Sequence, residues 1–457
     1  MNAVEDWLLA HEPDALATLM QFCRIPSVST DPAFATGIAQ AADFVADQLT
    51  QAGFPKVEVI ATPGHPCVLA EWCDKPNAPT ILVYGHYDVQ PTDPLDKWLS
   101  PPFEPTIRDG KLYARGVSDD KGPLMIPILV TAAYKAVTGG LPLNVKVLIE
   151  GEEESGSPNF DAAVARLKHR LACDLVVSAD GAMWRADLPS VTVASRGLVA
   201  LEVTVEGATK DLHSGRHGGS APNPIRALTQ ILASLHDAEG NIQVAGFADA
   251  ALPPDPLIAT AIRDVGFDAA GYFAGIGAPL PSPMPSGADL LTRQWLRPTL
   301  EFNGISGGYA GAGTKTVIPA TASAKITCRL VKGQVPDDVV LAIKRHLEAA
   351  LPTGLRLTVA QHGPGTPAFA LDPALPALKV AEAILTEVLG AQPLRVAMGA
   401  TIPIGEVFAR ILGVDTIFFS FSTSDEDYHA PNEYFRLSSF RTGQIAWARL
   451  FERLGAH

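Results

Sequence analysis

The sequence has few charged residues and no excess of basic ones. Lys and Arg number 35 against 49 Asp and Glu in 457 residues, which gives a formal net charge of -14. Because an acidic protein repels nucleic-acid phosphates and anionic lipids, we expect no nucleic-acid partner and no membrane partner. Only 18% of the residues are charged and 47% are hydrophobic, a balance that argues against a disordered chain.

Cysteine is also scarce, and long hydrophobic runs are missing. The five cysteines are irregularly spaced and include no Cys-x-x-Cys pair, so we expect neither a disulfide framework nor a thiolate zinc site. The longest apolar run, residues 123–134, is too short to span a bilayer. The first 14 residues have acidic rather than basic side chains and do not resemble a secretory signal. We therefore expect a cytoplasmic protein.

Four short apolar runs are expected to form the buried strands of one sheet. They are rich in β-branched or large apolar residues, and polar residues or glycines bound them. These runs are residues 80–84, 144–149, 174–178 and 416–420. Helical patterns occur at residues 123–137, 160–171, 375–389 and 438–454. The alternation predicts an α/β fold with a mixed or parallel sheet.

The middle of the chain has a different order of elements. Its patterns follow the order β-α-β-β-α-β, which is the split ferredoxin-like arrangement. The six segments are residues 201–205, 223–235, 300–305, 322–331, 337–351 and 355–361. Residues 240–298 are rich in Pro and Gly and are expected to form an irregular insertion with some short helices. We predict one α/β domain from residues 1–198 and 363–457, interrupted by an inserted α+β domain at residues 199–362.

Each of the four apolar runs is followed by residues that can bind a metal ion. In open α/β sheets, ligands bind beyond the carboxyl ends of the strands. The residues expected at this edge are His86, Asp88, one or more of Glu152, Glu153 and Glu154, Asp180, His429 and, from a loop before a helix, Asp119 and Asp120.

Such a cluster of acids is difficult to explain without a cation, because buried, unpaired carboxylates are costly. Imidazole and carboxylate ligands without a thiolate suit Zn²⁺ or a similar divalent ion. The ligands suffice for two ions, which would share a bridging carboxylate, and a remaining Glu would act as general base. Any one of these residues alone is more often a cap, a turn or a solvated side chain. Their joint position at successive strand ends favours the metal site.

The sequence resembles the co-catalytic di-zinc metallopeptidase family of carnosinase-type dipeptidases, glutamate carboxypeptidases, aminoacylases and succinyl-diaminopimelate desuccinylase. The matching motifs are GHYDVQP (85–91), WLSPPFEP (98–105), RGVSDDKG (115–122), EGEEESGS (150–157), KDLHSGRHGG (210–219), GAGTKTVIP (311–319), RLV (329–331), GATIP (399–403) and HAPNE (429–433). They occur in the family's order. The forms of HYDVQP and KDLHSG are most similar to the dipeptidase branch.

The resemblance implies which residues hold two Zn²⁺ ions in each subunit, with Mn²⁺ or Co²⁺ as possible replacements. His86, Asp119 and Asp180 would hold one ion. Asp119, Glu154 and His429 would hold the other, so that Asp119 bridges the pair.

The resemblance also implies a general base and a residue that orients His86. Glu153 would be the base, and Asp88 would hydrogen-bond the second ring nitrogen of His86. This assignment aligns the run of acids as Glu-Gly-x-Glu-Glu-Ser-Gly-Ser, with Glu152 at the variable position. A shift of one residue would exchange the base and the ligand.

The inserted domain would be the family's lid and dimerisation domain, which implies a homodimer. His213 would reach an active site, commonly that of the partner subunit, and stabilise an oxyanion. Arg329 would bind a free substrate carboxylate. Asn303, Thr401 and Gly399 would position the substrate.

The expected reaction is metal-dependent hydrolysis of an amide bond in a dipeptide or short peptide with a free C-terminal carboxylate. The alternative is an N-acyl-amino-acid amidohydrolase or desuccinylase with the same metal chemistry. A binding protein that keeps the fold without catalysis is a third hypothesis, which the complete set of ligands disfavours. The glycine-rich residues 304–313 lack the ending of a phosphate-binding loop.

Overall fold

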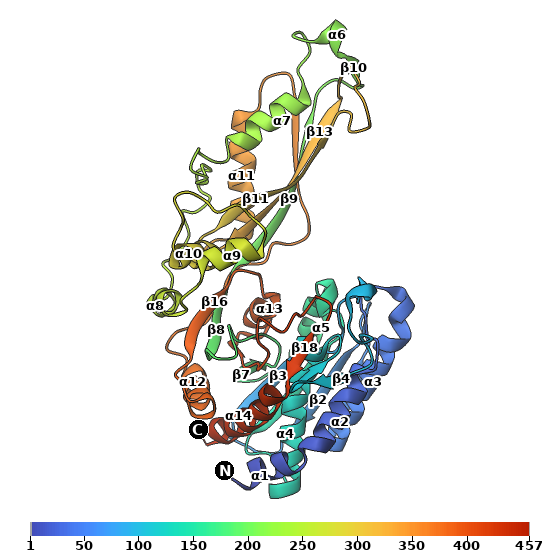
Figure 1. Ribbon diagram of the computed structural model, residues 1–457, viewed down its shortest axis with the longest axis vertical. Coiled ribbons are helices and arrows are strands. Elements are labelled where there is room, and N and C mark those ends of the chain that lie inside the picture. The colour runs from blue at the N-terminus through green and yellow to red at the C-terminus, as the bar shows by residue number, and fades with distance from the viewer. Residues whose placement is uncertain (1, 457) are drawn as a thin grey trace. The chain divides into compact units, whose positions relative to one another are not determined.

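The structure is a computed structural model that describes residues 2–456. The chain forms two compact units, of which the first comprises Met1–Val193, Leu371–Val396 and Val407–His457. The second comprises Ala194–Ala370 and Ala397–Glu406. The chain therefore crosses between the units four times, and the short segment 397–406 belongs to the second unit (Figure 1).

A six-stranded mixed sheet forms the centre of the first unit, in the order β1-β2-β6-β3-β7-β17. The strands are β1 (Lys56–Ile60), β2 (Cys67–Trp72), β3 (Thr80–His86), β6 (Asn144–Glu150), β7 (Leu175–Ser178) and β17 (Thr416–Phe418). The last four pair in parallel, whereas β1 and β2 add an antiparallel edge. All four predicted strands are present, and the predicted α/β fold class with a mixed sheet is confirmed.

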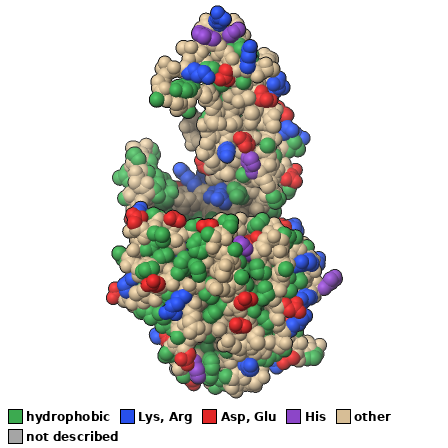
Figure 2. Space-filling model, turned by 90° about the vertical axis from the view of Figure 1, so that its right-hand side faces the viewer, with side chains coloured by type: hydrophobic (Ala, Val, Ile, Leu, Met, Phe, Trp, Pro, Cys, Tyr) green, Lys and Arg blue, Asp and Glu red, His purple; other side chains and the backbone are tan. Residues whose placement is uncertain are grey.

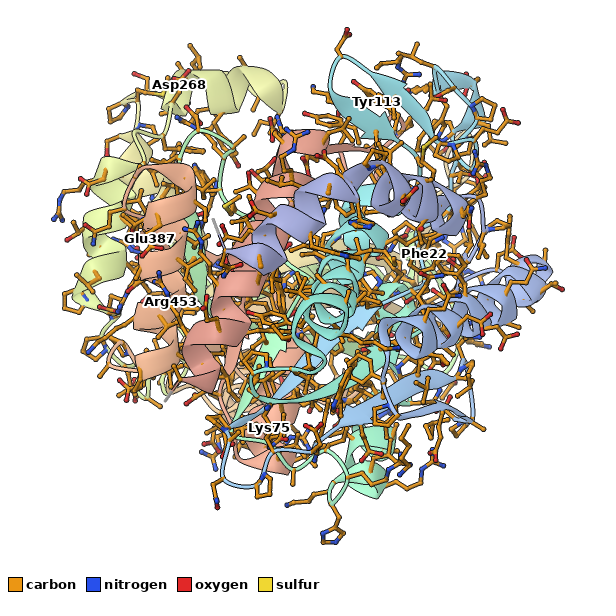
Figure 3. The ribbon with its side chains drawn as sticks, turned by 90° about the horizontal axis from the view of Figure 1, so that it is seen from below. Phe22, Lys75, Tyr113, Asp268, Glu387 and Arg453 are labelled. Carbon is orange, nitrogen blue, oxygen red and sulfur yellow. The ribbon has the colours of Figure 1, made fainter. Side chains whose placement is uncertain are left out.

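Helices from both ends of the chain pack with this sheet. They are α1 (Ala3–Ala10), α2 (Glu12–Cys23), α3 (Ala35–Ala52), α4 (Gly122–Thr138), α5 (Phe160–Leu167), α12 (Pro376–Leu389) and α14 (Leu437–Gly455). The C-terminal helix α14 is tied to α4 by the Tyr134 hydroxyl, which donates to the Ala448 carbonyl at 2.8 Å. It is tied to α12 by the ion pair between Arg453 and Glu387, both labelled in Figure 3.

The second unit has the predicted β-α-β-β-α-β order. Its sheet has the order β11-β13-β9-β14. The elements are β9 (Gly197–Glu206), α7 (Pro224–Ala233), β11 (Thr299–Gly307), β13 (Thr321–Leu330), α11 (Pro336–Ala350) and β14 (Arg356–Gln361). One face of β9 and β13 packs on α7 and α11 through a buried apolar cluster that includes Val203, Leu228, Ile326 and Ile343. The insertion between α7 and β11 contains α8 (Pro256–Asp264), α9 (Ala269–Gly275) and α10 (Gly287–Leu296).

Several short elements complete the fold. In the first unit β4 (Thr106–Arg108), β5 (Lys111–Tyr113) and β18 (Tyr434–Arg436) form a small sheet, and in the second unit β10 (Leu212–His213) pairs with β12 (Val317–Ile318) beside α6 (Ser214–His217). β8 (Ser190–Ser195), β15 (Phe369–Ala370), β16 (Leu394–Met398) and α13 (Pro403–Leu412) lie where the chain passes from one unit to the other. Among the described residues, none of the helices has both the length and the apolar character that a membrane span requires.

Candidate metal centre

The carboxyl end of β3 places His86 inside the first unit. The ring is fully buried. Its Nδ1 lies 3.1 Å from the backbone oxygen of Asp88, and its Nε2 lies 3.0 Å from Oδ1 of Asp119. Because Nδ1 faces a carbonyl, it carries the hydrogen of a neutral ring, and Nε2 is left free to bind a metal.

Asp88 faces the second ring nitrogen of His86 with two of its oxygens. Nδ1 lies 3.1 Å from the backbone oxygen of Asp88 and 3.5 Å from its carboxylate. That buried carboxylate also accepts hydrogen bonds from the backbone N–H groups of Glu153 and Glu154, at 3.2 and 3.0 Å. Asp88 therefore joins the end of β3 to the turn that carries the two glutamates.

Asp119 lies between two histidines from opposite ends of the chain. Its Oδ1 is 3.0 Å from Nε2 of His86, and its Oδ2 is 3.0 Å from Nε2 of His429. Two groups of potential ligand atoms result, and within each group all atoms lie within 4.8 Å of one another. One group is His86, Asp119 and Asp180, and the other is Asp119, Glu154 and His429. A carboxylate with one oxygen in each group is arranged as a bridge between two ions.

The three consecutive glutamates separate into different environments. Glu154 lies in the group just described, with Oε2 at 3.2 Å from Nε2 of His429. Glu152 is turned away, because its carboxylate accepts hydrogen bonds from the His65 backbone and from the side chain of Asn159. Of the two possible alignments, this geometry favours the one with Glu152 at the variable position.

Glu153 lies beside the two ligand groups without belonging to either. Burial raises the pKa of its carboxyl well above the usual value, and Asp180 and Asp119 add to the shift against the opposing effect of His86. A carboxylate with a raised pKa is a stronger base. Its position and basicity suit proton transfer better than metal binding.

The donor set fits divalent cations. It consists of imidazole nitrogens and carboxylate oxygens, which Zn²⁺, Mn²⁺ and Co²⁺ accept. Burial raises the pKa of Asp180 to about 6, with further contributions from Asp119 and Glu154. Hydrogen bonds to Asp119 and Glu154 raise the pKa of His429 to about 10. Burial is the main cause of the first shift and hydrogen bonds to carboxylates are the main cause of the second, and neighbouring negative charge adds to both.

Glu433 holds the bridging residue in place, and the sequence analysis assigned it no role. Its buried carboxylate accepts the backbone N–H groups of Gly116, Ser118 and Asp119, at 2.8, 2.9 and 3.2 Å. It also pairs with the buried Arg115 guanidinium at 2.7 Å. The only sequence signal was its place in the HAPNE motif. Its partners are mostly backbone atoms, which no residue pattern reveals.

His213 lies in the second unit, at the start of α6. It is exposed, and its Nδ1 accepts the backbone N–H of Gly215 at 3.0 Å. A neutral ring in this arrangement carries its hydrogen on Nε2, which therefore can donate to an acceptor. Figure 2 shows histidine and basic side chains gathered at the end of this unit where Figure 1 places α6.

Three of the four residues predicted to position the substrate lie close together in the second unit. Nη1 of Arg329 donates to the Thr401 hydroxyl at 2.7 Å, and Gly399 is two residues before Thr401. Asn303 is exposed in β11, at a bulge where the register with β13 shifts. The structure does not place Asn303 in this group, and its role remains a prediction.

Comparison with known proteins identifies the class. A model of Peptidase family M20/M25/M40 matches residues 82–453. The chain belongs to this family. The Cys-Gly metallodipeptidase DUG1 of Saccharomyces cerevisiae is 29% identical to it, with 96% of this chain and 94% of that protein covered. The Beta-Ala-His dipeptidase of Homo sapiens is 30% identical, over 99% of this chain and 92% of that protein.

Solved structures agree with this assignment. The M20 family metallo-carboxypeptidase Sso-CP2 of Sulfolobus solfataricus matches with a TM-score of 0.84 and 29% identity, covering 97% of this chain and 99% of that chain. Human carnosine dipeptidase 1 matches with a TM-score of 0.79 and 28% identity, covering 99% and 98%. The predicted family and the predicted enzyme class, a metallopeptidase of the dipeptidase type, are confirmed.

The substitution Asp180→Asn should stabilise the metal-free protein and destabilise the metal-loaded one. Because burial raises the pKa of Asp180 from 3.8 to about 6, the folded state favours the protonated acid, and stability falls as pH rises through this range. An amide removes that penalty but is a poor replacement for the carboxylate ligand. We expect a higher Tm for the chelated variant than for chelated wild type at pH 7, and a smaller difference at pH 5.

The measurement is thermal unfolding with a chelator and with Zn²⁺. Asp187→Asn is the control, since Asp187 is an exposed carboxylate paired with Arg185. A lower Tm of the chelated Asp180→Asn protein at pH 7 would contradict the prediction.

The substitution Glu433→Gln should weaken both the fold and metal binding. The amide replaces one carboxylate oxygen with an NH₂ group, which cannot accept the hydrogen bonds that this oxygen receives. It also leaves the buried Arg115 without its counter-charge, and the loss of one partner of a buried ion pair costs about 3 kcal/mol or more. Metal affinity should fall about 10- to 100-fold, as for other groups that orient ligands. Denaturant unfolding and zinc titration measure the two effects. Glu387→Gln, which breaks the surface ion pairs with Arg449 and Arg453, should cost less than about 1 kcal/mol for each pair. Equal effects of the two substitutions would contradict the prediction.

Proposed function

We propose that this protein hydrolyses the amide bond of dipeptides or short peptides that carry a free C-terminal carboxylate, with two divalent cations in the first unit. The observation that carries the proposal is the position of Asp119, with one carboxylate oxygen facing His86 and the other facing His429. The family assignment supports the reaction class.

We assign the cations to two sets of ligands. His86, Asp119 and Asp180 would hold one, and Asp119, Glu154 and His429 would hold the other. When bound, such cations lower the pKa of water towards neutrality and polarise a carbonyl oxygen. Zn²⁺ is our first choice for both sites, and Mn²⁺ or Co²⁺ would fit the same donor atoms.

Glu153 would act first as general base and then as general acid. Its carboxylate takes a proton from the attacking water and returns it to the nitrogen of the leaving amine. Asp88 holds the backbone of Glu153, which limits the movement of the base between the two transfers.

Residues of the second unit would bind the substrate. Arg329 would pair with the terminal carboxylate, and Thr401, Gly399 and Asn303 would contact the rest of the C-terminal residue. His213 would donate its Nε2 hydrogen to the developing oxyanion, in the active site of the partner subunit. The exposed ring and the hydrogen bond from Gly215 to Nδ1 support this donor role.

We also propose a homodimer, formed through the second unit as a lid and dimerisation domain, in the cytoplasm. β11 is an edge strand with exposed Phe302 and Ile305, and such edges are prone to pair with another chain. The five free cysteines support a reducing compartment. Light scattering that finds only monomers would contradict the dimer.

Two substrate classes remain as candidates. The relatives are described as Cys-Gly and Beta-Ala-His dipeptidases, which favours dipeptides. N-acyl amino acids present the same amide and carboxylate, so the metal centre does not distinguish them. Dipeptides are our first choice because the names of these relatives all describe dipeptidases.

The substitution Glu153→Gln should lower kcat about 10²- to 10⁴-fold and leave zinc bound. The change removes the base without changing any proposed ligand. Steady-state kinetics and metal analysis of the same samples measure both quantities. Glu152→Gln is the matched control, because Glu152 is the neighbouring glutamate and its buried carboxylate accepts hydrogen bonds from the His65 backbone and the Asn159 side chain. A loss of kcat in the control as large as in Glu153→Gln would contradict the assignment.

A substrate panel tests the proposed reaction itself. We expect the protein loaded with Zn²⁺ or Mn²⁺ to hydrolyse dipeptides such as Cys-Gly or β-Ala-His at least about tenfold faster, in kcat/KM, than N-acetyl or N-succinyl amino acids. Chelation should abolish the activity, and added metal should restore it. Faster turnover of the acylated compounds would establish the alternative, and no turnover of either class would overturn the proposal.

A further inference from the structure

A second arginine of the second unit lies beside Arg329. Arg196 follows β8 and precedes β9, one residue before Gly197. In the β9–β13 pairing Arg329 is opposite Leu198. Residues directly opposite each other in two paired strands share a face of the sheet, so Leu198 and Arg329 lie on the same face, which is turned away from the apolar cluster under α7 and α11. Arg196 stands two residues before Leu198, in the link between β8 and β9.

Arg196 forms hydrogen bonds with the segment that carries Gly399 and Thr401. Its backbone N–H lies 3.2 Å from the carbonyl oxygens of both Met398 and Ala400. Its Nε donates to the Gly399 carbonyl at 2.8 Å, and its Nη1 to the Arg297 carbonyl at 3.1 Å. Three consecutive carbonyls of the segment thus face one residue.

Gly399 leaves the space that this arrangement needs. A Cβ at this position would lie 2.8 Å from the Gln294 carbonyl oxygen and 3.4 Å from Nη2 of Arg196. A larger residue would therefore collide with the Gln294 carbonyl and would be in contact with the guanidinium. The glycine leaves room for both groups to pack against this segment.

Neither guanidinium has an acid to pair with. Among the described residues, no carboxylate lies within ion-pair distance of Arg196 or Arg329, and Nη2 of each makes no hydrogen bond. Burial and the positive charge of Arg329 lower the pKa of Arg196 to about 10, with Glu301 opposing the shift. Two partly buried cations side by side repel each other, and a bound anion relieves the repulsion.

We propose that Arg196 and Arg329 together bind the free carboxylate of the substrate, through the N–H groups that their protein contacts leave unused. This inference rests on the proposed function and adds a residue to it. Arg329 forms a hydrogen bond with Thr401 and Arg196 forms one with Gly399, so one short segment fixes the spacing of the two guanidinium groups. A carboxylate can accept hydrogen bonds from two guanidinium groups because each of its oxygens has two lone pairs.

The test compares each substrate with its C-terminal amide. In Arg196→Gln, we expect KM for the dipeptide acid to rise about 10- to 100-fold with kcat nearly unchanged, since hydrogen bonds between charged groups are lost. The amide, which lacks the charge, should lose less than about twofold in kcat/KM. Arg196→Lys keeps the positive charge but lacks the planar guanidinium, so its KM for the dipeptide acid should lie between those of the wild type and Arg196→Gln. Arg356→Gln, which removes an exposed arginine of the same unit paired with Glu206, is the control.

A binding measurement separates this inference from the proposed function. Calorimetric titration of the dipeptide acid and amide into Glu153→Ala protein, with and without Arg196→Gln, reports recognition without turnover. Equal weakening of acid and amide would show that Arg196 only maintains the fold of the 397–406 segment, and would overturn the inference while the hydrolysis proposal stands. Failure of the wild-type protein to hydrolyse any dipeptide would overturn the proposed substrate, while a selective loss of acid binding in Arg196→Gln would still support the inference.

Discussion

Electrostatic repulsion among buried acids is the constraint around which the first unit is built. Glu150 ends β6 and Asp180 follows β7, and Asp119, Glu153 and Glu154 come from short helical turns of the same unit. Glu150 and Asp120 are fully buried, and burial raises the pKa of Glu150 to about 8. Protonation or a bound cation offsets the charge of acids that are buried together. The divalent metal that the family implies would relieve part of this repulsion.

The positions of Asp119, Glu153 and Glu154 are fixed by two further acids that belong to neither group of candidate ligands. Asp88 fixes the turn with Glu153 and Glu154 through their backbone N–H groups, and Glu433 does the same for Asp119. Backbone contacts of this kind set the position of a whole loop, where a side-chain contact sets only one rotamer. The second unit repeats the principle with opposite charge, since Arg196 holds backbone carbonyls of the segment that anchors Arg329.

The four central strands could be predicted from the sequence because short apolar runs form them. The proposed ligands His86, Asp180 and His429 follow such runs, and the structure brings them into the two groups around Asp119. Their role as ligands stays a prediction. The roles within Glu152–Glu154 could not be assigned in this way, because the sequence does not show that Glu152 faces His65 and Asn159. Glu433 and Arg196 received no role, since their partners are backbone atoms from distant segments. The first 79 residues were left without predicted elements, although α1 to α3 and both antiparallel edge strands form there.

The order of the ligands along the chain has a consequence for biosynthesis. His86 is made early, but His429 follows it by 343 residues, and the Glu433 that holds the Asp119 backbone comes later still. During synthesis the acids that precede His429 are therefore present before this histidine. The two groups of candidate ligands are complete only after His429 has emerged from the ribosome, so capture of cations by both groups would follow its synthesis.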